Sequence, residues 1–192
     1  MKQALSISIG SSTRNKSAEV QLLGQEVRIE RIGTDGDMTA ARQMYRENDG
    51  KVDAFGVGGT DLGLFFADKW YPLHSVSHLV KDVLITPVAD GCGLKNTLEV
   101  RCAAVLEAEI GEYLDRVGRT ALVMTAVDRY GLLRSFVDAG YTCTFGDVLF
   151  SLGMPLPLHN ERSVKNIMTL LIPIVSRLPF EWVYPVGEKQ HQ

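Results

Sequence analysis

The 192-residue chain lacks several features that would assign it quickly to a class of protein. It has only three cysteines, at positions 92, 102 and 143, and no C-x-x-C pair, which excludes a zinc ribbon and a thioredoxin-like motif. Its net charge of −3 includes no basic excess, which argues against nucleic acid or an anionic membrane surface as a partner. Its most apolar late segment, Ile167 to Val175, is far shorter than the ~20 residues of a membrane-spanning helix.

The composition is that of an ordinary globular protein. The chain is 45% hydrophobic and 22% charged, so it can bury a core without a metal or a disulfide. The few, widely spaced cysteines favour the reducing cytoplasm as its location. The N-terminal residues MKQALSISIGSS alternate apolar and polar side chains, which is typical of a strand rather than of a signal peptide.

Strand and helix signals alternate along the first half of the chain. Alternation predicts strands over residues 4–9, 20–23 and 27–32, the last two joined by a tight turn. Asp37 predicts the start of a helix that ends before Gly50, and 52–57 is predicted as the next strand. A strand or hairpin arm over 64–73, a short helix capped by Ser75 and ending at Val83, and a strand over 84–88 follow.

The second half repeats the pattern after a long helix. Asn96 opens that helix, with Glu99 at the spacing of a capping box, and Val117 ends it. Strands are predicted over 120–125 and 141–145, and helices over 130–139 and 163–178. We therefore expect an α/β fold of two lobes with mainly parallel sheets. Residues 1–93 form the candidate substrate lobe, 94–118 a connecting helix, and 119–192 a Rossmann-like lobe that is incomplete at its C-terminus.

Glycine and aspartate gather where the predicted strands end. Ligands of parallel α/β sheets bind beyond the carboxyl ends of the strands, so these turns predict a cleft that includes Asp61 and Asp90. Two alternatives remain. Glycine and aspartate also serve as ordinary turn and helix-cap residues, and the turn aspartates could belong to a metal-dependent enzyme.

The segment from Thr120 to Asp147 has the layout of a dinucleotide-binding unit. Residues 126–131 stand in the place of G-x-G-x-x-G, and Gly131 is the one glycine of that fingerprint that remains. Asp147 lies near the position of an acidic residue that holds a ribose hydroxyl. Asp128 would repel a pyrophosphate, and Arg129 could offset that charge. The alternative is a purely structural strand–helix–strand unit.

Residues 95–99 form the cluster best suited to chemistry on a hydroxyl group. Lys95 can exchange a proton with a secondary alcohol if its surroundings shift its pKa, and Asn96 and Thr97 can orient a polyol. The alternative is that Asn96 and Glu99 form only a capping box and that Lys95 is a solvated lysine beside it. Weaker candidates are a metal site at His74 and His78, and a reactive thiol at Cys92 between two glycines.

Segments spread over nearly the whole chain carry a family resemblance. They are 29–37, 49–56, 90–91, 93–99, 127–131, 145–147, 178–182, 184–185 and 187–189. On these residues the sequence resembles a family of bacterial proteins named quinate 5-dehydrogenase, whose members continue past residue 192. The order of elements is similar to that of shikimate and quinate dehydrogenases, in which an Asn-Thr-Asp motif opens a helix between a substrate domain and a nicotinamide-binding domain.

The resemblance implies a cytoplasmic enzyme that oxidises quinate, or a similar cyclic polyol acid, with NAD or NADP. It allows a homodimer and implies neither a nucleic-acid nor a membrane partner. The expected roles are catalysis by Lys95 and Glu99, substrate binding by Asp61, Asp90, Asn96 and Thr97, and cofactor binding by Asp128, Arg129, Gly131 and Asp147.

The chain departs from those dehydrogenases at two motifs. Leu98 replaces the catalytic aspartate of Asn-Thr-Asp, and no Asn-Val-Thr…Lys motif precedes it. Either other groups carry the reaction or the activity is lost. The alternative function is a non-catalytic nucleotide- or metabolite-binding α/β protein.

Overall fold

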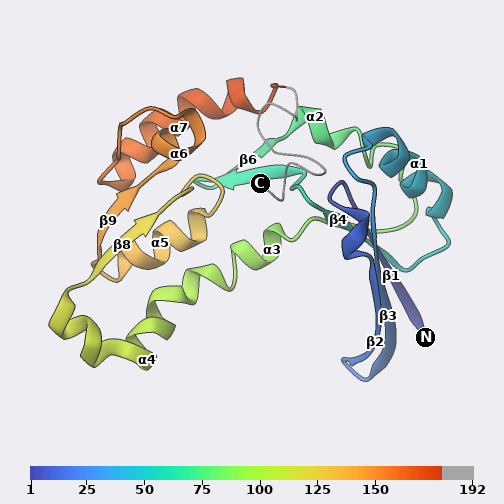
Figure 1. The fold of residues 1–192 in the computed structure, drawn as a ribbon, viewed down its shortest axis with the longest axis horizontal. Coiled ribbons are helices and arrows are strands. Elements are labelled where there is room, and N and C mark those ends of the chain that lie inside the picture. The colour runs from blue at the N-terminus through green and yellow to red at the C-terminus, as the bar shows by residue number, and fades with distance from the viewer. Residues whose placement is uncertain (179–192) are drawn as a thin grey trace. The chain divides into compact units, whose positions relative to one another are not determined.

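The computed structural model describes residues 1–178 and shows a mixed α/β protein that divides into two compact units (Figure 1). Unit 1 comprises Met1–Gly63, Pro72–Gly91 and, of the described residues, 176–178. Unit 2 comprises Leu64–Tyr71 and Cys92–Val175. Residues 179–192, with the last segments of the family resemblance, lie outside the described part. Within residues 1–178, no helix combines the length and apolar character needed to cross a membrane.

Unit 1 is built on a five-stranded mixed sheet of order β2-β3-β1-β4-β7. Its strands are β1 (Lys2–Ser8), β2 (Lys16–Leu22), β3 (Gln25–Gly33), β4 (Ala54–Gly58) and β7 (Val88–Ala89). The β1–β3, β1–β4 and β4–β7 pairs are parallel, and β2 pairs antiparallel with β3. The tight turn predicted between β2 and β3 is present: Leu23 and Gly24 both have positive φ, as a two-residue hairpin turn requires.

Helix α1 (Met38–Asn48) packs on one face of this sheet. As predicted, Asp37 caps it, and its carboxylate accepts the N–H groups of Thr39 and Ala40, both at 2.9 Å. Tyr45 is fully buried, and its hydroxyl lies 2.9 Å from the carbonyl oxygen of Ile7 and 3.1 Å from that of Gly56. The helix is therefore tied to two neighbouring strands, β1 and β4.

Two predictions for unit 1 are wrong. Ser75 does not cap a helix, because α2 (His74–Ser77) begins one residue earlier and spans a single turn. In place of the strand predicted over 84–88, the structure has only the two-residue strand Val88–Ala89. Elsewhere in unit 1, a short 3-10 helix, η1 (Ser12–Arg14), follows β1. The Asp49 carboxylate accepts the N–H groups of Leu84, Ile85 and Thr86, which takes those donors away from a strand ladder.

Unit 2 contains β5 (Gly63–Phe66), β6 (Lys69–Pro72), α3 (Cys92–Lys95), η2 (Glu99–Arg101), α4 (Cys102–Val117), β8 (Thr120–Val123), α5 (Tyr130–Asp138), β9 (Thr142–Phe145), α6 (Asp147–Leu152) and α7 (Glu161–Val175). β8 and β9 pair in parallel around α5, which confirms the predicted strand–helix–strand segment. One apolar core joins these elements; its most buried members include Phe66, Ala126, Leu133, Phe145 and Val164.

The long helix predicted from Asn96 is interrupted. α3 ends at Lys95, a 3-10 turn covers Glu99–Arg101, and α4 begins only at Cys102. The start of α4 is fixed by a buried partner in α5, because Ser135 Oγ accepts the Ala103 N–H at 2.8 Å. The prediction also missed α6 and placed the start of α7 at Ser163, whereas Asn160 caps that helix and accepts the Ser163 N–H at 2.8 Å.

Candidate functional site

Lys95 and Asp128 form an ion pair in unit 2. The Lys95 Nζ lies 2.7 Å from Asp128 Oδ1, and the two side chains are only 20% and 26% exposed. Lys95 stands at the end of α3, and Asp128 stands in the turn between β8 and α5, beyond the carboxyl end of β8. The fold thus brings a predicted catalytic residue against a predicted cofactor residue from 33 positions away.

A second ion pair lies on the same two segments. Arg129 contacts Oε1 of Glu99, whose side chain is 17% exposed. The other oxygen of Glu99, Oε2, is buried and has no hydrogen-bond partner among the described residues. Glu99 therefore belongs to a bridge between η2 and the β8–α5 turn, and not to the capping box that its spacing from Asn96 predicts.

Gly131 is required by a close approach of two backbones. A Cβ at this position would lie 2.4 Å from the carbonyl oxygen of Lys95 and 3.1 Å from Cγ1 of Val100. Both distances are shorter than a comfortable contact, so the absent side chain lets residues 95–100 rest on the first turn of α5. In the structure Gly131 serves the packing of residues 95–100 against α5.

Asp147 is almost fully buried, with 1% of the residue exposed. Its Oδ1 accepts the Val127 N–H at 2.7 Å, while Oδ2 has no partner among the described residues. Burial raises the pKa of this carboxyl; backbone hydrogen bonds from Val127 and Ala126 work in the opposite direction. Asp147 therefore ties the turn after β8 to the turn after β9.

Asn96 and Thr97 are exposed in the turn that follows α3. The Thr97 hydroxyl donates to the carbonyl oxygen of Gly93 at 2.6 Å, which leaves its oxygen as an acceptor. Both side chains lie in the segment that carries Lys95. The remaining predicted substrate residues, Asp61 and Asp90, belong to unit 1, where their carboxylate oxygens lie within 4.8 Å of each other and Asp90 accepts the Leu62 N–H.

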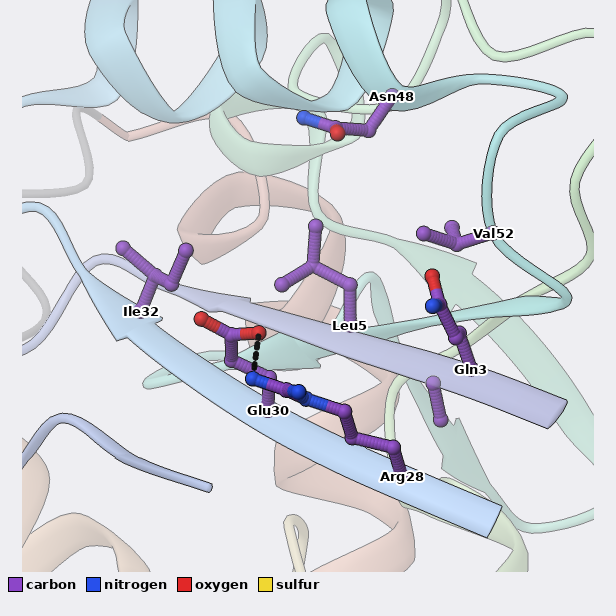
Figure 2. A pocket seen from close by; sticks show the side chains of 8 residues that line it. Gln3, Leu5, Arg28, Glu30, Ile32, Asn48 and Val52 are labelled. Carbon is purple, nitrogen blue, oxygen red and sulfur yellow. Dashed lines mark ion pairs between the residues drawn. The ribbon is translucent and has the colours of Figure 1, made fainter. Parts of the chain in front are cut away.

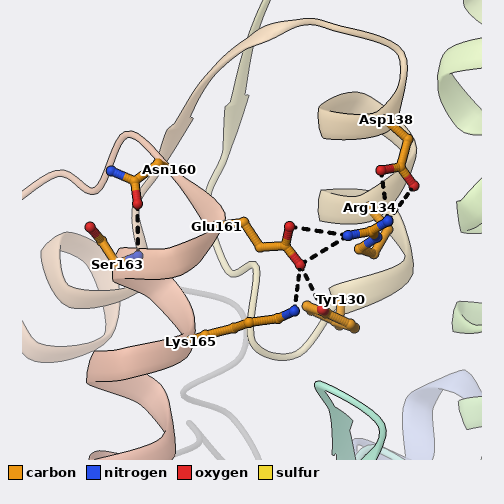
Figure 3. Close-up of polar contacts among 7 residues, drawn as sticks. All are labelled: Tyr130, Arg134, Asp138, Asn160, Glu161, Ser163 and Lys165. Atoms are coloured by element: carbon orange, nitrogen blue, oxygen red, sulfur yellow. Dashed lines mark hydrogen bonds and ion pairs between the residues drawn. The ribbon is translucent and has the colours of Figure 1, made fainter.

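Sequence reasoning missed a network centred on Glu161, between α5 and α7 (Figure 3). The Glu161 carboxylate accepts the Tyr130 hydroxyl at 2.8 Å and contacts Lys165 and Arg134 at 2.9 and 3.1 Å. Burial opposes its ionisation, but these three partners outweigh burial and hold the Glu161 pKa at about 2. Only the Glu161–Lys165 spacing of four residues is a local signal that could have indicated part of it.

Unit 1 also holds an open pocket of about 280 Å³ on the α1 side of its sheet (Figure 2). Gln3 and Leu5 of β1, Arg28 and Glu30 of β3, and Asn48 of α1 line it. Its two charges face each other at 3.8 Å, both 44% exposed. A loose, exposed ion pair of this kind offers little to a ligand.

The β8–α5 turn does not fit a nicotinamide dinucleotide. The two turn residues that would meet a pyrophosphate, Asp128 and Arg129, are engaged with Lys95 and Glu99. The space that Gly131 leaves open is filled by the Lys95 carbonyl, and Asp147 is buried on the Val127 N–H rather than presented to a ribose.

Two family models match the chain. One, described as Domain of unknown function (DUF8753), matches residues 3–90. The other, described as Domain of unknown function (DUF8754), matches residues 93–192. Neither a curated protein nor a solved structure matches the sequence. The two matched ranges meet close to the Gly91–Cys92 division between the units.

Proposed function

Since the chain belongs to the family described as Domain of unknown function (DUF8754), a description that names no activity, we propose its function from the contacts of unit 2 and from the resemblance of its sequence. The proposal is that unit 2 acts on a hydroxyl group of a small polyol acid such as quinate. Lys95, held by Asp128, exchanges a proton with that hydroxyl during its oxidation to a ketone.

The Lys95–Asp128 pair is the observation that carries this proposal. In its neutral form the Lys95 amine can accept a hydroxyl proton, and the Asp128 carboxylate 2.7 Å away stabilises the ammonium that forms. In the reverse direction the ammonium returns the proton to a carbonyl oxygen. Both side chains keep about a fifth to a quarter of their surface exposed, so a ligand can reach them.

The neighbouring residues suit a hydroxylated ligand. Asn96 offers an exposed amide, and the Thr97 oxygen remains an acceptor. The resemblance implies NAD or NADP, which would supply the hydride acceptor. Because the β8–α5 turn does not fit the pyrophosphate, we assign no step through that cofactor.

An assay of the purified protein with quinate or shikimate and either NAD or NADP tests the proposal. We expect the absorbance of reduced nicotinamide to rise with the unmodified protein and not with Lys95→Met. Lys95→Arg sharpens the test: it keeps the charge beside Asp128 but cannot give up its proton, so it should bind ligand without turnover. Lys81→Met, at an exposed position, is the control and should retain activity. No turnover by the unmodified protein with any pair would refute the dehydrogenase.

A second candidate function is the binding of a metabolite without turnover. The observation that favours it is the internal pairing of the charges around the β8–α5 turn. It predicts that quinate or a nucleotide raises the melting temperature of the protein although no reduced nicotinamide forms. Loss of that rise in Lys95→Met would place the ligand at the same residues.

The proposed function also carries an expected lobe architecture and cellular location. Under it, unit 2 is a Rossmann-like lobe and unit 1 a substrate lobe, in a cytoplasmic protein that can form homodimers. The free thiols of Cys102 and Cys143 suit a reducing compartment.

A further inference from the structure

The two faces of the unit 1 sheet differ in charge. Side chains alternate between faces, so the strand registers fix which residues share one. Figure 2 shows Arg28, Glu30 and Leu5 on the α1 side. The opposite face, which we call the small-residue face, carries Lys2, Ala4, Ser6 and Ser8 of β1, Lys16, Ala18, Val20 and Leu22 of β2, Val27, Ile29, Arg31 and Gly33 of β3, and Ala54, Gly56 and Gly58 of β4. These strand positions include three cations and no carboxylate.

Two of the three cations lie side by side without an acidic partner. Arg31 is opposite Lys16 on β2 and opposite Ser6 on β1. Its guanidinium donates to Ser8 Oγ at 2.9 Å and to the carbonyl oxygen of Ser11 at 3.1 Å. Among the described residues, neither Arg31 nor Lys16 forms an ion pair. Two positive charges thus stand uncompensated at this end of the face.

The buried Ser8 hydroxyl next to them is an unused donor. Its oxygen accepts both the Arg31 guanidinium and the Gly10 N–H, and its own proton has no acceptor among the described residues. Ser8 is 1% exposed. The Asp35 carboxylate contacts the loop after β1, where it accepts the Ser12 N–H at 2.7 Å and is therefore already engaged by the backbone.

The surroundings leave room for a small ligand. Gly56 and Ser6 lie beside Arg31 across the sheet, so short side chains form the floor. An open hollow of about 390 Å³ borders the same stretch of β2 and β3. Asn15, Lys16 and Arg31 line it together with Ser17, Glu30 and Ile32, which alternate to the α1 face. The position is also the usual one for a ligand of a parallel sheet, beside the carboxyl end of β1 and its Gly-Ser-Ser-Thr loop.

We propose that the small-residue face binds the phosphate group of a small molecule through Lys16, Arg31 and the loop that follows β1. A phosphate group carries about −1.5 to −2 charges at pH 7 and so matches the charges of Lys16 and Arg31, which lack an acidic partner among the described residues, better than the single charge of a carboxylate does. Burial and the like charge of Arg14 both lower the pKa of Arg31, and a bound dianion relieves that repulsion. This site lies within unit 1 and is independent of the function proposed for unit 2.

Titration of the whole protein with inorganic phosphate at low ionic strength tests this site. We expect saturable amide chemical-shift changes at Ser6, Ser8, Gly10 and Gly56, and a higher melting temperature. Sulfate, a dianion of the same shape, should bind too, and quinate, a monocarboxylate, should bind these residues more weakly. The absence of saturation at about 10 mM phosphate, or equally tight binding of quinate at the same amides, overturns the proposal.

Substitutions on the two faces of β2 and β3 complete the test. Lys16→Met should weaken phosphate binding about fivefold, and Arg31→Met more than about tenfold because its guanidinium also shapes the loop. Arg28→Met removes the same charge from the same strand on the α1 face and should leave binding unchanged. If Arg28→Met weakens binding as much as Lys16→Met, the effect is one of net charge and the site is refuted. If Arg31→Met fails to fold, the comparison of phosphate affinity between Lys16→Met and Arg28→Met decides whether the site exists.

Discussion

The two units use charged side chains in opposite ways. In unit 2 the charges are paired across elements: Lys95 with Asp128, Arg129 with Glu99, and Glu161 with Arg134 and Lys165. On the small-residue face of unit 1, Lys16 and Arg31 stand together without an acidic partner among the described residues. Paired charges hold a fold together, whereas unpaired charges of one sign repel each other until an anion arrives. Substitutions in the two units should therefore have different consequences.

The largest effect is expected at the centre of the paired network. Glu161→Gln leaves Arg134 and Lys165 without their shared carboxylate and weakens the hydrogen bond from Tyr130. The substitution should therefore lower the free energy of unfolding by about 2–3 kcal/mol. Urea unfolding at pH 7 measures it, with the exposed Glu112→Gln as the control. A loss no larger than that of Glu112→Gln would contradict the stabilising role of the network.

The same network predicts a pH dependence. The pKa of Glu161 is held at about 2, below its ordinary value of 4.5, so its contribution is complete above pH 4.5 and is lost as the pH falls toward 2. The difference in stability between the unmodified protein and Glu161→Gln should shrink over that interval. A difference that stays constant would contradict the lowered pKa.

A somewhat smaller effect is expected at Gly131. Alanine there places a Cβ 2.4 Å from the Lys95 carbonyl oxygen, so the backbone of residues 95–100 must shift, at a cost of about 2 kcal/mol. Gly111, inside α4, is the matched control: its nearest neighbour is 3.8 Å away, and Gly111→Ala should raise stability by about 0.5 kcal/mol. Thermal unfolding of both variants checks the pair, and equal shifts of the same sign would contradict the close approach.

The buried Asp147 should give a smaller effect of opposite pH sign. Burial raises its pKa, so the unmodified protein loses part of its stability as the pH rises and this carboxyl ionises. Asp147→Asn removes the ionisation, and its stability relative to the unmodified protein should increase as the pH rises from 4 to 7. Urea unfolding at both pH values gives the comparison. If the stability of Asp147→Asn relative to the unmodified protein falls as the pH rises, the folded protein favours the ionised form of Asp147 and the prediction is wrong.

The smallest effect belongs to the unpaired cation. Lys16→Met breaks no ion pair with a described residue, so it should change the free energy of unfolding by less than about 0.5 kcal/mol in the absence of phosphate. The same variant should nevertheless lose phosphate affinity. A stability loss comparable to that of Glu161→Gln would remove the distinction between the two kinds of charge.

Local signals predicted much of the fold. Alternation in β1 and β3, the Asp37 cap of α1 and the apolar runs of β8 and β9 each depend on neighbours in sequence, and all five elements are present. The predictions failed where a distant group competes for the backbone. Asp49 draws 84–86 out of a strand, and the interrupted start of α4 depends on Ser135.

The site shows the same division between local and distant contacts. Residue type singled out Lys95, Glu99, Asp128 and Arg129, because charged groups beside strand ends suit chemistry. Their pairing could not be predicted, since the partners are 33 and 30 positions apart and meet only when η2 packs on α5. The small-residue face was equally hidden, because a strand register decides that Lys16 stands opposite Arg31.

Tyr45 makes the integrity of unit 1 visible by absorbance. Its hydroxyl is shared between carbonyl oxygens of β1 and β4, and burial raises its pKa far above that of an exposed tyrosine. In an alkaline titration the ring should keep the spectrum of a neutral phenol while exposed tyrosines become phenolates. Its late change would coincide with the separation of α1 from the sheet, so the protein carries its own optical reporter of that event.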